Sequence, residues 1–191
     1  MITVVIPSIL PRTGPGGLGA RTVASVNAQT LRPRRLIVEV DRVGEGAAAV
    51  RNRALERVDT EWVAFVDDDD ELYPDHLRLC ARAARLNGAD VVYPGYDTSG
   101  GPDPVGCFGM PFDGDLLQRL YIFRVSVLAR TDAVRAAGGI QALPDVHGDP
   151  CEDWGLWLAM HRLGASFYHL PQKTWQWNLA PGSTRGRADR W

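Results

Sequence analysis

Short apolar segments alternate with helix-forming segments through the first half of the chain, and this alternation restricts the fold more than any other feature. Segments rich in apolar and β-branched residues, as buried strands are, lie at 2–6, 36–40, 62–66 and 90–93. Segments with the composition and boundary residues of helices lie between them, at 21–29, 45–58 and 74–86. This order predicts an α/β fold with a mostly parallel central sheet and helices on both faces.

The second half of the chain is less regular. Glycine, proline and aspartate are frequent in 95–120, which indicates loops over an edge of the sheet. Beyond these loops we expect a strand over 121–130, a helix over 152–163 and short strands at 166–170 and 175–177. Because 191 residues suit one domain with a sizeable core, we interpret the second half as an elaboration of the first.

The overall composition argues against several classes of partner and location. A net charge of −2 gives no general attraction to nucleic acid or to an anionic membrane, so we expect no nucleic-acid partner. No apolar stretch approaches the length of a membrane span, and the start of the chain has the pattern of a strand instead of a signal peptide. The three cysteines, Cys80, Cys107 and Cys151, fit neither a zinc site nor a disulfide framework, which favours a reducing, cytoplasmic location.

Four consecutive aspartates, Asp67 to Asp70, follow the apolar segment 62–66. Carboxylates this close repel one another unless a positive charge lies among them, and hard carboxylate oxygens suit Mg²⁺ or Mn²⁺. The carboxyl end of a strand is also the place where open α/β sheets bind ligands. The run therefore indicates a metal site, and the alternative is a solvated acidic turn before the next helix.

A second acidic motif, Glu152-Asp153, begins the expected helix over 152–163. One carboxylate of such a pair can serve as a general base if it faces a substrate hydroxyl. Acidic residues are also common in the first turn of a helix, because the helix dipole favours negative charge there. From the residues alone both interpretations of the pair stay open.

Taken in order, the motifs resemble a known family. They are Val5-Ile6-Pro7-Ser8, Leu36-Ile37-Val38-Glu39-Val40-Asp41, Gly46-Ala47-Ala48-Ala49-Val50-Arg51-Asn52, Phe65-Val66-Asp67-Asp68-Asp69-Asp70, Gly138-Gly139-Ile140 and Glu152-Asp153-Trp154-Gly155-Leu156-Trp157. The set covers nearly the whole chain and is similar to the family 2 glycosyltransferases. The resemblance implies a GT-A fold, the nucleotide-diphospho-sugar transferase fold, with a nucleotide-binding half in 1–94. The other half, 95–191, would form the acceptor and catalytic part and end in a mobile tail.

The resemblance also implies roles for individual residues. Asp67 and Asp69 match the outer aspartates of the metal-binding DXD motif, and Asp153 matches the catalytic base of members that invert the sugar's configuration. The nucleotide-sugar contacts implied by position are Ser8, Asp41, Arg51 and Asp68. Where the family usually has a second acidic residue and a Gly-Ser turn after the second strand, this chain continues from Asp41 into Arg42-Val43-Gly44. We add Arg185 and Arg187 as candidates for covering the diphosphate, and His169 as a further metal ligand.

The activity implied by the resemblance is transfer of a sugar from a nucleotide-diphosphate sugar to an acceptor hydroxyl, with Mn²⁺ or Mg²⁺ as cofactor. A metal held by Asp67 and Asp69 would stabilise the departing phosphate, and Asp153 would accept the proton of the hydroxyl. The acceptor is left open among glycan, protein, lipid and small metabolite. A partner subunit that completes the acceptor site, including a second copy of the chain, is left open as well.

A rival motif suggests a different enzyme. Gly14-x-Gly16-x-x-Gly19 follows a strand, precedes a helix and lies ~20 residues before Asp41, as in NAD(P)-binding Rossmann-type oxidoreductases. Against it, seven residues from Pro7 to Thr13 separate the strand from the first glycine, and Pro15 removes a backbone N–H from the turn. A phosphatase with an aspartate nucleophile is a weaker rival, and a non-catalytic binding protein with the same fold is a third.

Overall fold

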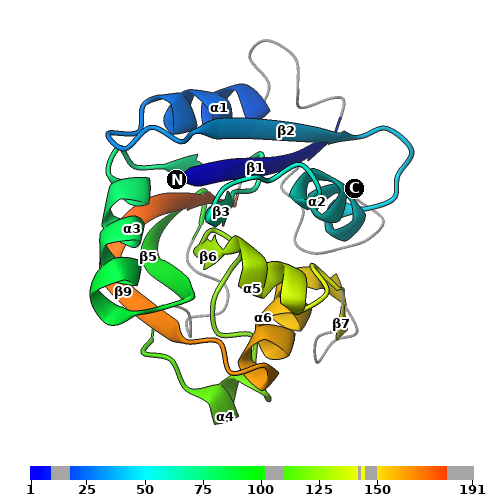
Figure 1. Cartoon of the computed structure of the whole chain (residues 1–191). Helices are drawn as coiled ribbons and strands as arrows, with labels where there is room; N and C mark the ends of the chain where they lie inside the picture. Colours follow the sequence, from blue (N-terminus) through cyan, green and yellow to red (C-terminus); the bar gives the residue numbers. More distant parts are fainter. Residues whose placement is uncertain (10–17, 102–109, 142, 145–149, 180–191) are drawn as a thin grey trace.

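The computed structural model describes residues 1–9, 18–101, 110–141, 143–144 and 150–179 (Figure 1). Its main feature is a seven-stranded sheet. In spatial order the strands are β2 (Arg35–Asp41), β1 (Ile2–Ile9), β3 (Trp62–Phe65), β6 (Leu128–Arg130), β5 (Val91–Ser99), β9 (Phe167–Asn178) and β4 (Glu71–Leu72). The short strands β7 (Leu143–Pro144) and β8 (Pro150–Cys151) pair separately.

The sheet is mostly parallel, as the sequence predicts. Strands β2, β1 and β3 are parallel to one another, and β5 is parallel to β9. The antiparallel strand β6 lies between these two groups, and β4 runs antiparallel to β9. The first-half strands therefore have their carboxyl ends at a common edge, where Asp41 and the acidic run lie.

Helices cover both faces of the sheet (Figure 1). They are α1 (Leu18–Asn27), α2 (Ala47–Leu55), α3 (His76–Asn87), α4 (Gly114–Leu117), α5 (Thr131–Ala136) and α6 (Glu152–Arg162). Alternate residues of each strand enter different cores, because successive side chains point to opposite faces. Val5 and Phe65 pack with α2, α5 and α6, whereas Val4 and Ala64 pack with α1 and α3.

The last strand differs from the sequence-based expectation. Segments 166–170 and 175–177 are parts of one long strand, β9, which pairs with β5 along its length. The register shifts beside Gly95, and a Cβ at Gly95 would lie 3.0 Å from the carbonyl oxygen of Pro171. Gly95 thus allows strands β5 and β9 to approach closely beside Pro171, where their regular pairing is interrupted.

The expected strand over 121–130 is shorter in the structure. Only its last part pairs, as β6 (Leu128–Arg130). The preceding residues are irregular but buried, with Ile122, Phe123 and Val125 in the core below α6. Among the described residues, no helix has the length and apolar character that crossing a membrane requires.

Candidate active site

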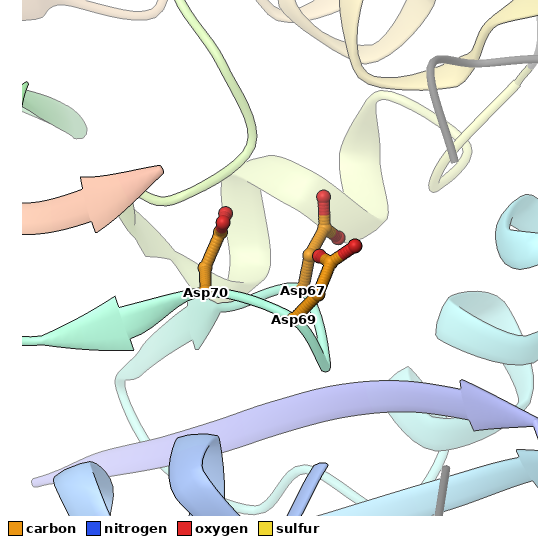
Figure 2. Close-up of side chains that lie close together, drawn as sticks. All are labelled: Asp67, Asp69 and Asp70. Carbon is orange, nitrogen blue, oxygen red and sulfur yellow. The ribbon is translucent and has the colours of Figure 1, made fainter. Parts of the chain in front are cut away.

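The acidic run forms a turn directly after β3, and three of its carboxylates converge (Figure 2). Oxygens of Asp67, Asp69 and Asp70 all lie within 4.8 Å of one another. Asp69 and Asp70 are buried and Asp67 is half-buried. Hard oxygen donors gathered in this way fit Mg²⁺ or Mn²⁺, so the residues present suit the cofactor that the motif predicts.

The third carboxylate, that of Asp70, was not among the predicted metal ligands. Burial raises the pKa of Asp70 well above its usual range, and the charges of Asp69 and Asp67 raise it further. The signal was present in the sequence, since the run contains four aspartates, but the DXD pattern selects only two of them. A divalent cation among these oxygens would relieve the repulsion that the pKa reflects.

Strand β9 and helix α1 hold the acidic turn in place. The side-chain amide of Asn178 donates to the backbone oxygen of Asp69 at 2.6 Å, and its backbone N–H donates to Asp70 Oδ1 at 3.1 Å. The hydroxyl of Thr22 donates to the backbone oxygen of Asp70 at 2.7 Å. The turn is therefore fixed by hydrogen bonds from residues distant in sequence, which orients its carboxylates before any ligand arrives.

Asp68 faces a different partner from its neighbours. Its Oδ2 accepts a hydrogen bond of 2.5 Å from the hydroxyl of Ser8, and both residues are buried. The structure thus brings together Ser8 and Asp68, two of the residues predicted to contact the nucleotide sugar. The pair connects the end of β1 to the acidic turn.

Arg51 lies at the centre of the candidate site, 2 % exposed on helix α2. One guanidinium nitrogen donates to Asp67, and another donates to Glu152 at 3.0 Å. Burial opposes its charge, but the carboxylates of Asp67, Glu152 and Asp153 together raise the pKa of Arg51 above its usual value. Arg51 therefore joins the predicted metal site to the predicted catalytic pair.

Glu152 and Asp153 form the first turn of α6. Asp153 is 8 % exposed and accepts hydrogen bonds from the Tyr121 hydroxyl and, at 3.2 Å, from the Trp154 backbone N–H. Burial raises the pKa of Asp153 to about 6, with a further contribution from the charge of Glu152, against the opposing effects of Tyr121 and Arg51. A carboxylate that titrates near neutrality has the proton affinity that a general base needs.

A close contact fixes the position of α6. A Cβ at Gly155 would lie 2.0 Å from the carbonyl oxygen of Gln141, so only a glycine lets that segment lie against the helix. On the neighbouring helix, the side chain of Asn52 exchanges two hydrogen bonds of 2.8 Å with the backbone of Ile140. These contacts attach the segment before α6 to α2, which carries Arg51.

Sequence reasoning missed two residues of the site, Tyr121 and Arg124. Tyr121 donates to Asp153, and partial burial first, then the charge of Asp153, raises the pKa of the Tyr121 phenol. The guanidinium of Arg124 lies 3.5 Å from the ring centre of Trp177, and its charge lowers the pKa of both Asp70 and Asp153. Neither residue belongs to a motif, and the irregular backbone of 121–127 gives no periodic signal.

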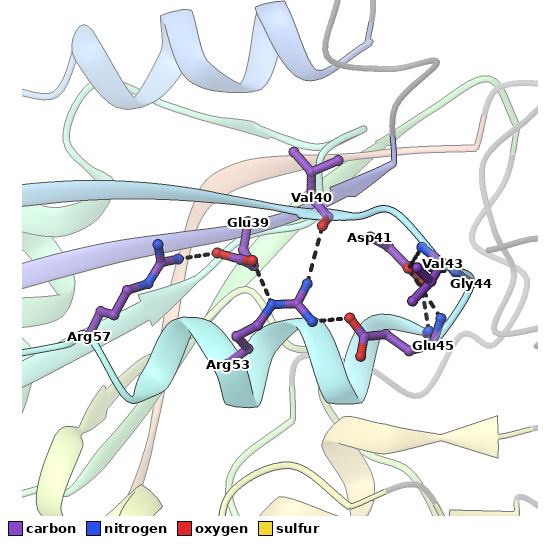
Figure 3. Close-up of polar contacts among 9 residues, drawn as sticks. Glu39, Val40, Asp41, Val43, Gly44, Glu45, Arg53 and Arg57 are labelled. Atoms are coloured by element: carbon purple, nitrogen blue, oxygen red, sulfur yellow. Dashed lines mark hydrogen bonds and ion pairs between the residues drawn. The ribbon is translucent and has the colours of Figure 1, made fainter.

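Asp41 organises the turn between β2 and α2 (Figure 3). Its Oδ1 accepts from the backbone N–H groups of Val43, Gly44 and Glu45 at 2.7–3.1 Å, and its Oδ2 accepts from that of Gly46 at 2.8 Å. Burial opposes the charge, but these hydrogen bonds lower the pKa of Asp41 overall. A carboxylate has about four acceptor positions, so the turn itself uses the capacity of this side chain.

The same turn is flanked by a surface network of charged residues (Figure 3). Arg53 contacts Glu39 at 2.6 Å and also contacts Glu45, while Arg57, in the turn just after α2, contacts Glu39 as well. The network fastens α2 to β2. It explains these arginines as structural, apart from Arg51 on the buried face of the same helix.

Several predicted residues lie elsewhere. His169 stacks on Tyr93 with ring centres 5.3 Å apart, burial lowers its pKa, and it does not belong to the acidic cluster. Gly14 and Gly16 of the rival motif, the tail arginines Arg185 and Arg187, and the tail predicted to be mobile lie outside the described residues. Gly19 is in the first turn of α1.

The mostly parallel sheet, with helices on both faces and an acidic turn after its third strand, is the architecture of a GT-A fold. Residues 20–106 match the sequence model of Glycosyl transferase family 2, which confirms the resemblance indicated by the motifs. The comparison with curated proteins found no significant match.

Solved structures with the same fold include TarS of S. aureus. The 1-349 fragment superposes with a TM-score of 0.70 at 15% identity, covering 93% of this chain and 60% of that one. Its complex with UDP-GlcNAc gives a TM-score of 0.72 at 17% identity, covering 95% of this chain and 59% of that one. Its complex with UDP gives 0.67 at 16% identity, covering 95% and 61%. The likeness shows a GT-A fold, and the chain spans about 60% of these structures.

Proposed function

We propose that this chain is a metal-dependent glycosyltransferase that moves a sugar from a nucleotide-diphosphate sugar to an acceptor hydroxyl, with inversion at the anomeric carbon. The observation that carries the proposal is the double contact of buried Arg51, with Asp67 of the acidic turn and with Glu152 beside Asp153. Arg51 thus links the acidic turn, which could hold a metal and a diphosphate, to the Glu152-Asp153 pair, which could activate a hydroxyl. A solvated acidic turn and a simple helix cap would not need that connection.

The acidic turn is the proposed metal site. Asp67, Asp69 and Asp70 would hold the ion, and their convergence within 4.8 Å supports this assignment. When bound, a divalent cation supplies positive charge to the diphosphate and stabilises the phosphate that leaves. Arg51 orients Asp67, and Asn178 orients Asp69 and Asp70 through the backbone and side chain of the turn.

Asp153 is the proposed general base. It would accept the acceptor's hydroxyl proton as the new bond from oxygen to the anomeric carbon forms and the bond to the phosphate oxygen breaks. The products would be the glycosylated acceptor, a nucleoside diphosphate and the protonated carboxyl. The Tyr121 hydroxyl fixes one oxygen of Asp153, and attack opposite the leaving group would invert the sugar.

The donor site is proposed at the carboxyl ends of β1 and β2. Ser8 and Asp68 would line it, Arg51 would lie at its diphosphate end, and Asp41 would shape its wall by holding the turn at 43–46. UDP-sugars are the first donors to try, because the TarS structures of the same fold contain UDP-GlcNAc or UDP. We expect the sugar to be a hexose, as in that donor.

The test measures nucleoside diphosphate released from UDP-sugars, to water and to simple sugar acceptors, with Mn²⁺, with Mg²⁺ and with EDTA. Asp153→Asn should lower the rate ~10²–10⁴-fold, because a positioned base contributes about that much. Asp132→Asn, an exposed aspartate in the first turn of α5, is the matched control and should keep the wild-type rate.

The result separates the competing functions. Binding of a nucleotide sugar without turnover by the wild-type chain would indicate a non-catalytic protein with this fold. NADH binding without nucleotide-sugar binding would restore the oxidoreductase alternative. Full activity in Asp153→Asn would reject the proposed base while leaving the class of enzyme intact.

A further inference from the structure

A cavity lies at the opposite end of the sheet from the acidic turn. Its cavity volume is about 660 Å³, within the range typical of small-molecule sites. It opens beside the first residues of β1 and β3, where Ile2 and Trp62 contribute to its wall. Trp62 begins β3 and Asp67 follows its end, so the rise of a strand places the two sites ~17 Å apart.

The charged residues of this cavity are mostly basic, although the whole chain has a net charge of −2. Four arginines and one glutamate line it. Arg130 is already neutralised, because it contacts Glu61 and Asp90 at 3.0 Å each. Its guanidinium also lies 4.6 Å from the ring centre of Trp62, so this pair forms a fixed aromatic wall.

The other three arginines retain most of their binding capacity. Arg34 has one distant carboxylate, Asp59 at 4.0 Å, and both side chains are more than half exposed. Among the described residues, Arg32 and Arg85 have no ion-pair partner. This contrasts with Arg51, Arg53 and Arg57, whose guanidinium groups contact carboxylates closely.

The backbone around these arginines is fixed. The N–H of Arg34 donates to the carbonyl of Ile2 at 2.8 Å, and that of Trp62 donates to the carbonyl of Met1 at 3.2 Å. Arg85 lies in the last turn of α3, which ends at a left-handed Gly88 that also lines the cavity. Arg32 and Arg34 thus come from the connection between α1 and β2, and Arg85 comes from α3, and these two parts of the chain both line the cavity.

We propose that this cavity, the basic cavity, is an anion-binding site that takes a ligand carrying a phosphate group. Guanidinium groups bind phosphate oxygens through paired charge-assisted hydrogen bonds, and three of them face one cavity here. Leu31 and Trp62 offer apolar surface beside the arginines, which suits a ligand whose phosphate is attached to an apolar or aromatic body. A phosphorylated metabolite and a phospholipid headgroup share this chemistry. Glu61 is the one acidic residue among the described residues that line the cavity, so we expect binding that needs no metal.

The test uses the whole protein with EDTA, which removes metal-dependent diphosphate binding at the acidic turn. Calorimetric titration with inorganic phosphate and pyrophosphate should show binding to the wild type. Arg32→Gln with Arg85→Gln should weaken it roughly tenfold or more, since two charge-assisted contacts to the anion are lost. Arg119→Gln with Arg162→Gln removes the same charge from exposed positions outside the cavity and should change binding less than about twofold.

A second arm identifies the source of the phosphate. Sedimentation with vesicles of phosphatidylcholine containing phosphatidylglycerol, compared with phosphatidylcholine alone, detects a headgroup ligand. Vesicle binding that the cavity variant loses would assign the site to a lipid, and binding of the soluble anions alone would assign it to a free phosphorylated compound. Equal binding by the cavity and control variants, or none by a folded wild type, would overturn the proposal.

Discussion

At Arg51, one buried guanidinium stabilises carboxylates from two distant parts of the chain. Asp67 follows β3 and Glu152 begins α6, 101 positions from Arg51 along the sequence. A buried ion pair contributes little when compared with a well-packed apolar substitute, but removal of one partner leaves the others uncompensated. The residue therefore has a structural effect that can be measured separately from catalysis.

We predict that Arg51→Gln lowers the free energy of unfolding by ~3–5 kcal/mol, because Asp67 and Glu152 lose their shared counter-charge. Arg53→Gln, in the same helix but with a side chain 38% exposed, should cost less than ~1 kcal/mol. Urea denaturation of both variants gives the comparison. An equal effect of the two substitutions would contradict the central role of Arg51.

The pKa of Asp153 predicts how the reaction depends on pH. Burial first, and then the charge of Glu152, raises this pKa to about 6, so the carboxyl is mostly protonated below pH 6 and mostly ionised above it. A general base must be ionised, and kcat/KM should therefore rise tenfold per pH unit below about 6 and level off above it. Glu152→Gln removes one source of the shift and should move the midpoint to lower pH. A midpoint unchanged in that variant would argue against Asp153 as the titrating group.

The residues of the site differ in how far the sequence could predict them. Asp67, Asp69 and Asp153 belong to motifs that resemble those of the family 2 glycosyltransferases, so they could be proposed without a structure. Tyr121 and Arg124 could not, because they reach the site through irregular backbone and their partners are set by tertiary packing. Asp70 was visible in the run, but its convergence with Asp67 depends on the shape of the turn.

At the scale of elements, the turn between β2 and α2 depends on one side chain. Asp41 accepts hydrogen bonds from four successive backbone N–H groups, 43–46, and Gly44 and Gly46 have the positive φ angles of 79° and 88° that this turn needs. The turn also precedes the helix that carries Arg51. A change at Asp41 should thus affect both folding and the position of the site.

We predict that Asp41→Asn lowers the free energy of unfolding at pH 7 by ~1–3 kcal/mol, because an amide nitrogen would face N–H donors. Since folding lowers the pKa of Asp41, its stabilising contribution is present above the unfolded value of about 3.9 and is lost as the pH falls through the folded value. The difference between the variant and the wild type should accordingly shrink below about pH 3.9. Glu45→Gln in the same turn is the control, and denaturation at several pH values provides the measurement.

Elements were predicted best where the local pattern determines them. The strands and helices of 2–93 follow from runs of apolar residues and their boundaries, and the structure confirms the alternation. The sequence pattern predicts two strands where the structure has β9, because Pro171 interrupts the pattern, whereas pairing with β5 continues past the proline through a register shift. The strand over 121–130 was overestimated, since an apolar buried segment need not pair. Whether a segment pairs as a strand depends also on its partner strand, and the local sequence pattern carries no information about that partner.

For the whole molecule, the proposed metal and donor sites predict stabilisation by ligand. A ligand present at 100 times its Kd adds about 2.7 kcal/mol to the free energy of unfolding, and a chain of this size should gain ~2–4 °C in Tm for each kcal/mol. UDP-GlcNAc with Mn²⁺ should raise Tm by that amount in a thermal-shift assay. Asp67→Asn with Asp69→Asn should abolish the metal-dependent part of the shift, while Asp113→Asn, an exposed helix-capping aspartate of α4, should not. An equal shift in EDTA would contradict metal-dependent binding.

The hydrogen bonds from Asn178 to the acidic turn have a consequence for how the protein is made. Asn178 lies 108 positions after Asp70, so at roughly 5–20 residues per second the ribosome needs roughly 5–20 s to reach it after Asp70 is made. During that interval the nascent chain contains the four aspartates without the strand that orients them. The acidic turn is therefore among the last parts of the molecule to acquire its final form during translation.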